Sequence, residues 1–116
     1  MTCDEGGSNR AQIDMALLPL VVAKNLAHAD AIIARLISGA VPLVTRIIDA
    51  KLKRHSVDVR DAQEADQLKA DVIVRLLARL EQCRVDSARG RIGNWNGYVA
   101  TTTRHTCDEY LRRKYP

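Results

Sequence analysis

Apolar residues recur every three or four positions in four stretches of the chain, and polar residues separate these stretches. This spacing is typical of amphipathic helices, and it predicts helices over residues 10–27, 30–54, 61–82 and 95–113. Residues 1–9 are polar and contain two glycines, which predicts a disordered terminus. Residues 10–116 are expected to form a single all-α domain, a compact bundle of three to four helices with the last two antiparallel.

The third predicted helix has the clearest pattern. Its wide apolar face, at i, i+3 and i+4 spacing, consists of Ala65, Leu68, Val72, Ile73, Leu76, Leu77 and Leu80. Asp61 and Glu64 are spaced as a capping box at its start. The opposite face is polar except for Val74, an apolar side chain where contact with water is expected.

Other residues mark the ends and irregularities of the remaining helices. Asp30 is predicted to cap the second helix and Asn94 the fourth, because short polar side chains accept hydrogen bonds from free backbone N–H groups. Pro19 is expected to kink or interrupt the first helix, since proline has no N–H to donate. Trp95 opens the fourth helix beside a glycine-containing loop, and we expect it to be partly exposed and not a core anchor.

The composition fits one helical domain. Of the 116 residues, 47% are hydrophobic but only 3% are aromatic, which disfavours both disorder and a β-sandwich. Three cysteines without a Cys-x-x-Cys pair argue against a disulfide scaffold or zinc site and for the reducing cytoplasm. The longest apolar run, residues 16–23, is shorter than the roughly 20 residues that cross a bilayer. A cytoplasmic protein without a membrane partner is expected.

The positive charge is concentrated near the end of the chain. Residues 1–83 contain equal numbers of basic and acidic side chains, so residues 84–116 carry the whole net charge of +4. The same segment contains the only tryptophan and all three tyrosines. Basic side chains attract phosphates and aromatic faces can stack on exposed bases, so this segment is a candidate nucleic-acid interface. Cations near a helix C-terminus that stabilise the helix dipole are the alternative.

No arrangement of residues indicates catalysis or a cofactor. The sequence has no nucleophile elbow, no phosphate-binding glycine loop and no His-Glu-x-x-His motif. His105 and Asp108 lie three residues apart on one helix face, which an ordinary surface contact explains. The chain is therefore not expected to be an enzyme or to hold a cofactor or metal.

The fourth predicted helix carries the most specific pattern in the chain. An aromatic residue opens it, a second aromatic follows three positions later, a basic pair lies in the middle, and an acidic residue and a basic triplet close it. These positions are Trp95, Tyr98, Arg104, His105, Glu109, Arg112, Arg113 and Lys114. The arrangement resembles the DNA-reading helix of bacterial sigma factors, in which asparagine stands at the place of His105 and aspartate at that of Glu109.

The resemblance continues upstream of this helix. Residues 64–80 are similar to the family's helix that binds the polymerase clamp, and residues 40–48 to the helix before it. The similarity covers about residues 28–114 and corresponds to region 2 of the sigma-70 superfamily, closest to the extracytoplasmic-function type. It implies a promoter-recognition domain that binds the beta-prime clamp of core RNA polymerase and the −10 promoter element to initiate transcription, with an anti-sigma factor as a further candidate partner.

The resemblance also implies which residues make each contact. The implied DNA-binding residues are Arg89, Arg91, Asn94, Trp95, Tyr98, Arg104, His105, Arg112, Arg113 and Lys114. The implied polymerase-binding residues are Gln67, Ala70, Asp71 and Val74. Of the family's clamp motif, Asp-Leu-Val-Gln-Glu, only Leu68 and the acidic Asp71 are kept. A sigma-like helical protein-interaction module without promoter melting therefore stays open as the alternative.

Overall fold

The periodic apolar pattern forms helices throughout the part of the chain that the computed structural model describes, residues 15–23, 25–54, 62–86 and 92–115. A 3₁₀ turn, η1 (Met15–Leu17), leads into the single-turn helix α2 (Leu18–Val21). Three long helices follow: α3 (Leu26–Arg54), α4 (Ala62–Val85) and α5 (Trp95–Lys114). The described residues contain no strand, so the prediction of an all-α fold is confirmed.

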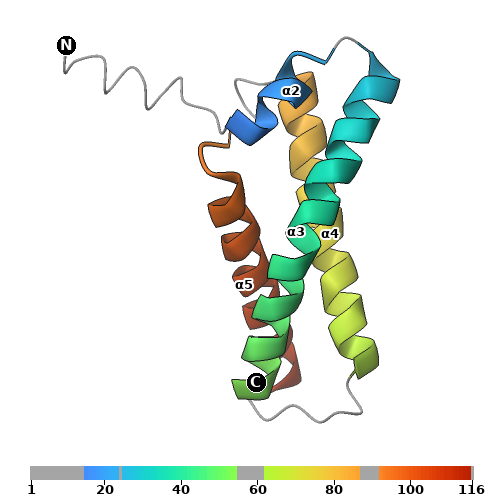
Figure 1. The fold of residues 1–116 in the computed structure, drawn as a ribbon. Helices are drawn as coiled ribbons and strands as arrows, with labels where there is room; N and C mark the ends of the chain where they lie inside the picture. The colour runs from blue at the N-terminus through green and yellow to red at the C-terminus, as the bar shows by residue number, and fades with distance from the viewer. Residues whose placement is uncertain (1–14, 24, 55–61, 87–91, 116) are drawn as a thin grey trace, which may run out of the picture.

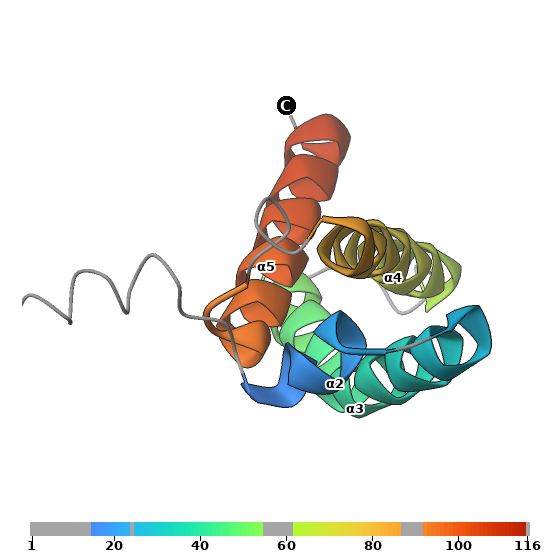
Figure 2. The same cartoon turned by 90° about the horizontal axis from the view of Figure 1, so that it is seen from above.

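The three long helices pack against one another in pairs, and α2 packs on α3 and α4. The chain descends along α3, returns along α4 and descends again along α5, so α4 and α5 run antiparallel as expected (Figure 1). Seen from above, the three helix axes surround a common centre (Figure 2). The ends of α3 and α5 consequently lie at the same end of the molecule as the start of α4.

The core lies where the three long helices meet. Its most completely buried side chains are Leu17 and Leu20 from the turns before α3 and, in the long helices, Val44, Ile48, Leu68, Val72, Leu76, Leu80, Cys83, Val99, Thr103 and Cys107. The prediction for the apolar face of α4 is confirmed at its centre, where every fourth residue from Leu68 to Leu80 is buried. Leu77 lies at the edge of this face and remains 37% exposed.

The beginnings of the first two helices differ from the prediction. The helix expected over residues 10–27 is, in its described part, a short turn in which Pro19 stands in the first turn of α2 and starts it, because no N–H is needed there. The helix α3 begins at Leu26, so Asp30 is not its cap. The Oδ1 of Asn25 instead accepts a hydrogen bond of 2.8 Å from the backbone N–H of His28.

The cap predicted for the last helix is confirmed. Asn94 has extended backbone angles, and its Oδ1 accepts a hydrogen bond of 2.9 Å from the N–H of Gly97. The capping residue predicted for α4, Asp61, and the predicted disordered segment 1–9 lie outside the described residues.

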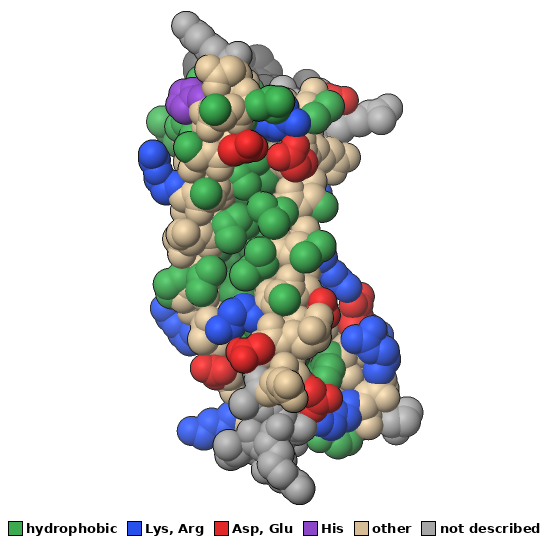
Figure 3. All heavy atoms as spheres, turned by 90° about the vertical axis from the view of Figure 1, so that its right-hand side faces the viewer, with side chains coloured by type: hydrophobic (Ala, Val, Ile, Leu, Met, Phe, Trp, Pro, Cys, Tyr) green, Lys and Arg blue, Asp and Glu red, His purple; other side chains and the backbone are tan. Residues whose placement is uncertain are grey.

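One described helix, α3, is long and apolar enough to cross a membrane by length and composition, with a mean hydropathy of 1.7 over its most apolar window. The argument from the short run at residues 16–23 missed this property. The core helix of a soluble protein passes the same test, but only 28% of this window is buried. Hydrophobic side chains line the seam between α3 and α4 (Figure 3).

Candidate functional site

The start of α5 is anchored by Trp95. Its side chain is only 5% exposed, so the expectation that it is partly exposed and not a core anchor is wrong. Trp95, Val99 and Thr103 are spaced four residues apart, which places them on the one face of α5 that packs on the neighbouring helices. The indole is therefore part of the core and is not accessible to stack on a base.

The second aromatic residue of the pattern, Tyr98, is half-buried beside Trp95. The two rings are stacked with their centroids 6.3 Å apart and their planes inclined by 23°. The Arg79 guanidinium of α4 lies 5.1 Å from the centroid of the Tyr98 ring. Tyr98 thus keeps some accessible surface, but its ring is held between α4 and α5.

The outward face of α5 is basic. Arg104, His105, Arg112 and Arg113 are all exposed on it, as expected for residues that contact DNA. Lys114 is less available because its Nζ lies 2.6 Å from the Oε2 of Glu64 and 3.1 Å from the hydroxyl of Tyr110.

The other predicted DNA-binding residues are divided between the start of α5 and the loop before it. Asn94 is exposed, but its side chain is engaged in the helix cap. Arg89 and Arg91 lie outside the described residues. The structure therefore brings together on one face only the residues from the middle and end of α5.

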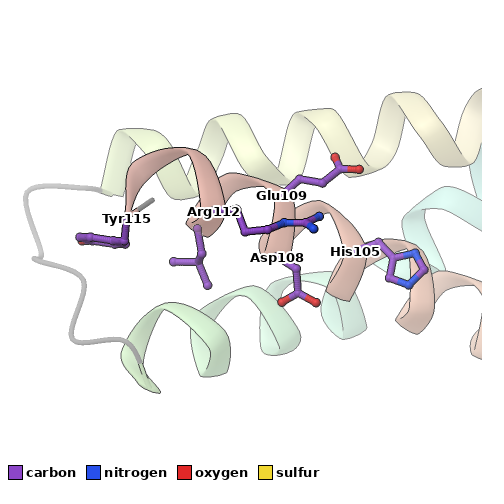
Figure 4. Close-up of a pocket in the computed structure, with 6 residues that line it drawn as sticks. His105, Asp108, Glu109, Arg112 and Tyr115 are labelled. Atoms are coloured by element: carbon purple, nitrogen blue, oxygen red, sulfur yellow. The ribbon is translucent and has the colours of Figure 1, made fainter.

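An open depression lies along this face at the end of α5, lined by His105, Asp108, Glu109, Leu111, Arg112 and Tyr115 (Figure 4). Its two carboxylates point to opposite sides and each binds a cation of a neighbouring helix. Asp108 accepts a hydrogen bond of 2.8 Å from Lys51 of α3, and Glu109 one of 2.7 Å from Arg75 of α4. These bonds lower the pKa of both carboxyl groups. The carboxylates therefore fasten α5 to the bundle and do not leave the face acidic.

The Lys51–Asp108 pair should make a small, pH-dependent contribution to stability. Because the pKa of Asp108 is lowered in the folded protein, its stabilisation is present above the ordinary carboxyl pKa near 4 and is lost as the pH falls through the folded value. Both side chains are partly exposed, so Asp108→Asn is expected to cost about 0.5 kcal/mol at pH 7. Urea denaturation at pH 7 and pH 3 measures this cost, and an equal cost at both would contradict the prediction.

The residues predicted to bind polymerase lie on the outward face of α4. Gln67, Ala70 and Val74 are exposed, Asp71 is half-buried, and Val74 is 63% exposed. The Nε2 of Gln67 donates a hydrogen bond of 3.2 Å to the Oδ1 of Asp71. If Asp71 were paired with Arg75, this would be an ordinary solvated face. The Arg75 guanidinium instead points to α5, where it donates hydrogen bonds to Glu109 and, at 3.0 Å, to the Thr106 hydroxyl. The face thus combines an apolar centre with a polar edge.

The buried thiols have no features of reactive groups. Burial raises the pKa of the Cys83 thiol and raises that of Cys107 to about 11. Thiols act as nucleophiles in the thiolate form, so both side chains serve as packing groups at neutral pH. Among the described residues there is also no group of three or more histidine, cysteine or acidic side chains that could hold a metal ion.

Sequence reasoning missed one group of cations, at the end of α3, of which Lys53 and Arg54 are exposed and Lys51 is paired with Asp108. Lys51, Lys53 and Arg54 form its last turn. They were overlooked because the net charge of residues 1–83 as a whole is zero. The clustering of basic residues just before the predicted end of a helix was the available sign.

These observations define an all-α protein with a basic face on α5 and a separate, partly apolar face on α4. No protein-family model, curated protein or solved structure matches this chain.

Proposed function

We propose that the chain is a sigma region 2-like domain that binds core RNA polymerase through α4 and −10 promoter DNA through α5. One observation carries the proposal: the exposed members of the two implied sets, Gln67, Ala70 and Val74 on α4 and Arg104, His105, Arg112 and Arg113 on α5, lie on neighbouring helices, and these helices run antiparallel (Figure 1). A protein and a nucleic acid could therefore be bound at the same time without competing for one surface.

The surface of α4 supports the protein-binding half of this proposal. Protein interfaces commonly combine an apolar centre with a polar rim. Val74 supplies an exposed apolar centre, Gln67 and Asp71 supply a polar edge, and Leu77 is a further apolar side chain of α4 that is partly exposed. Capture of core RNA polymerase by the immobilised chain is the direct test.

The surface of α5 supports the DNA-binding half. Arg104, Arg112 and Arg113 are exposed and suited to contact backbone phosphates, which position DNA without reading its sequence. The burial of Trp95 removes the main candidate for stacking on an unpaired base. Base recognition in the described part of the chain would then depend on His105 and the accessible part of Tyr98.

Binding of single-stranded DNA is expected to depend strongly on salt. If about three or four phosphates are neutralised, the log–log slope of affinity against salt should be roughly −2 to −3. Affinity would then fall roughly 15- to 60-fold between 50 and 200 mM salt. Fluorescence anisotropy with a −10-like oligonucleotide measures this slope, and a scrambled oligonucleotide tests sequence preference. A flat response to salt would contradict an interface built on phosphate contacts.

A sigma-like interaction module without promoter melting is the second candidate, and the burial of Trp95 favours it. The two functions differ in one measurement. A duplex carrying a fluorescent base analogue in the −10 element should brighten when the chain and core polymerase are added together if the DNA opens. Polymerase capture without any such signal would identify the interaction module.

A further inference from the structure

Two of the long helices end in clusters of basic residues. The last turn of α3 contains Lys51, Lys53 and Arg54, and the last turn of α5 contains Arg112, Arg113 and Lys114. The two clusters are far apart in the sequence, and the ion pair between Lys51 of α3 and Asp108 of α5 joins residues 57 positions apart. Their common position is therefore a property of the fold.

Ion pairs join the two helix ends to each other and to α4. The Lys51 Nζ of α3 lies 2.8 Å from the Asp108 Oδ1 of α5. The Lys114 Nζ of α5 lies 2.6 Å from the Glu64 Oε2 in the first turn of α4. Both descending helices finish at this end of the molecule (Figure 1). We call the exposed cations Lys53, Arg54, Arg112 and Arg113 the basic end.

Three carboxylates near the ends of α3 and α5 are engaged with cations outside the basic end. Asp108 is bound by Lys51, Glu109 by Arg75, and Glu64 by Lys114. Within residues 15–23, 25–54, 62–86 and 92–115, no carboxylate forms an ion pair with any of the four cations of the basic end. All four side chains are exposed. The basic end therefore carries positive charge that no ion pair within the described residues neutralises, although Asp108 and Glu109 attract Arg112, and Glu109 also attracts Arg113, without contacting them.

We propose that the basic end binds consecutive phosphates of a nucleic-acid backbone, so that α3 contributes to an interface otherwise formed by α5. This inference rests on the DNA-binding half of the proposed function and adds Lys53 and Arg54 to it. The helix dipole explains cations in each last turn separately. It does not explain two such turns side by side, since like charges at one site repel each other. A polyanion removes that repulsion and releases its own counterions on binding.

The test compares two double variants that remove the same charge from the same helix. Lys53→Gln/Arg54→Gln removes the α3 part of the basic end, and Arg35→Gln/Arg46→Gln removes two exposed arginines elsewhere on α3. Arg46 and Arg35 lie roughly 12 and 28 Å from Arg54 along the helix axis, beyond a Debye length of about 10 Å at 0.1 M salt. Circular dichroism and urea denaturation test whether both variants fold like the wild type.

Affinity for single-stranded and duplex DNA is measured by anisotropy at several salt concentrations. We expect Lys53→Gln/Arg54→Gln to weaken binding roughly tenfold or more at 0.1 M salt and to reduce the slope for single strands by roughly 1 to 1.5. The control variant should bind within about twofold of the wild type, because its charges are screened from the interface.

The other outcomes distinguish this inference from the proposed function. An equal loss in both variants, or no loss in either, overturns the inference and leaves promoter binding through α5 intact. Binding that depends on Lys53 and Arg54 but shows no preference for the −10 sequence and no polymerase capture supports the inference and overturns the proposed function. Binding to vesicles of anionic lipid without binding to DNA overturns the inference in favour of a membrane surface.

Discussion

Replacement of Trp95 by alanine is expected to lower the free energy of unfolding by about 3–5 kcal/mol, the usual cost of truncating a buried tryptophan. The indole is 5% exposed at the start of α5 and stacks on Tyr98, whose ring also contacts the Arg79 guanidinium. Its removal leaves a cavity and takes away the ring that supports Tyr98, the α5 partner of Arg79 in α4. Urea denaturation followed by circular dichroism measures the loss without depending on the fluorescence of the missing tryptophan.

Tyr115→Ala is the matched control for this prediction. Tyr115 is an aromatic residue at the other end of α5 and is 52% exposed, so its truncation should cost less than about 1 kcal/mol. A similar small cost for Trp95→Ala would mean that the indole does not anchor the core. It would also restore Trp95 as a candidate for contact with an unpaired base.

The largest functional effect is expected on the outward face of α4. The double variant Asp71→Lys/Val74→Asp places charge on its apolar centre and reverses the charge at its edge. Burying an unpaired charge in an interface is costly, so capture of core RNA polymerase should weaken tenfold or more, equivalent to about 1.4 kcal/mol. Val74 is 63% exposed, so the fold itself should tolerate the change. Surface interferometry with immobilised variants measures the affinity.

A second double variant controls for the added charges. Val22→Asp/Asp30→Lys makes the same two chemical changes at exposed positions after α2 and in the first turns of α3. It should capture polymerase like the wild type. If both variants keep full affinity, α4 is not the docking surface, and a loss in both would indicate a general effect of surface charge.

Local patterns in the sequence were sufficient to predict much of this fold. The period of the apolar residues from Leu68 to Leu80 predicts a helix with one buried face, and the same period leaves Val74 on the exposed face. Asn94 was identifiable as a cap because its short polar side chain directly precedes an apolar repeat. The free backbone N–H groups that such a side chain binds lie within the next few residues. These features depend only on neighbours in the sequence.

The competing local signals at the other helix starts were harder to rank. Both Asn25 and Asp30 are good capping residues, and the fold uses the earlier one, because α3 extends back to Leu26 and the buried Ala29. Pro19 was correctly associated with an irregularity but stands in the first turn of a short helix, where a kink or interruption of a longer one was expected. Choosing between such alternatives requires knowing which apolar residues find a surface to pack against.

The amino-acid sequence by itself determined the helical class, the buried face of α4 and the basic character of the last helix. Only the tertiary structure decided that Trp95 is buried, that Arg75 binds Glu109 of α5, and that the ends of α3 and α5 adjoin. The physical reason is that periodicity records which side of a helix is apolar but not which helix covers it. The ion pairs described between helices join partners 34 to 57 residues apart, which no local pattern encodes.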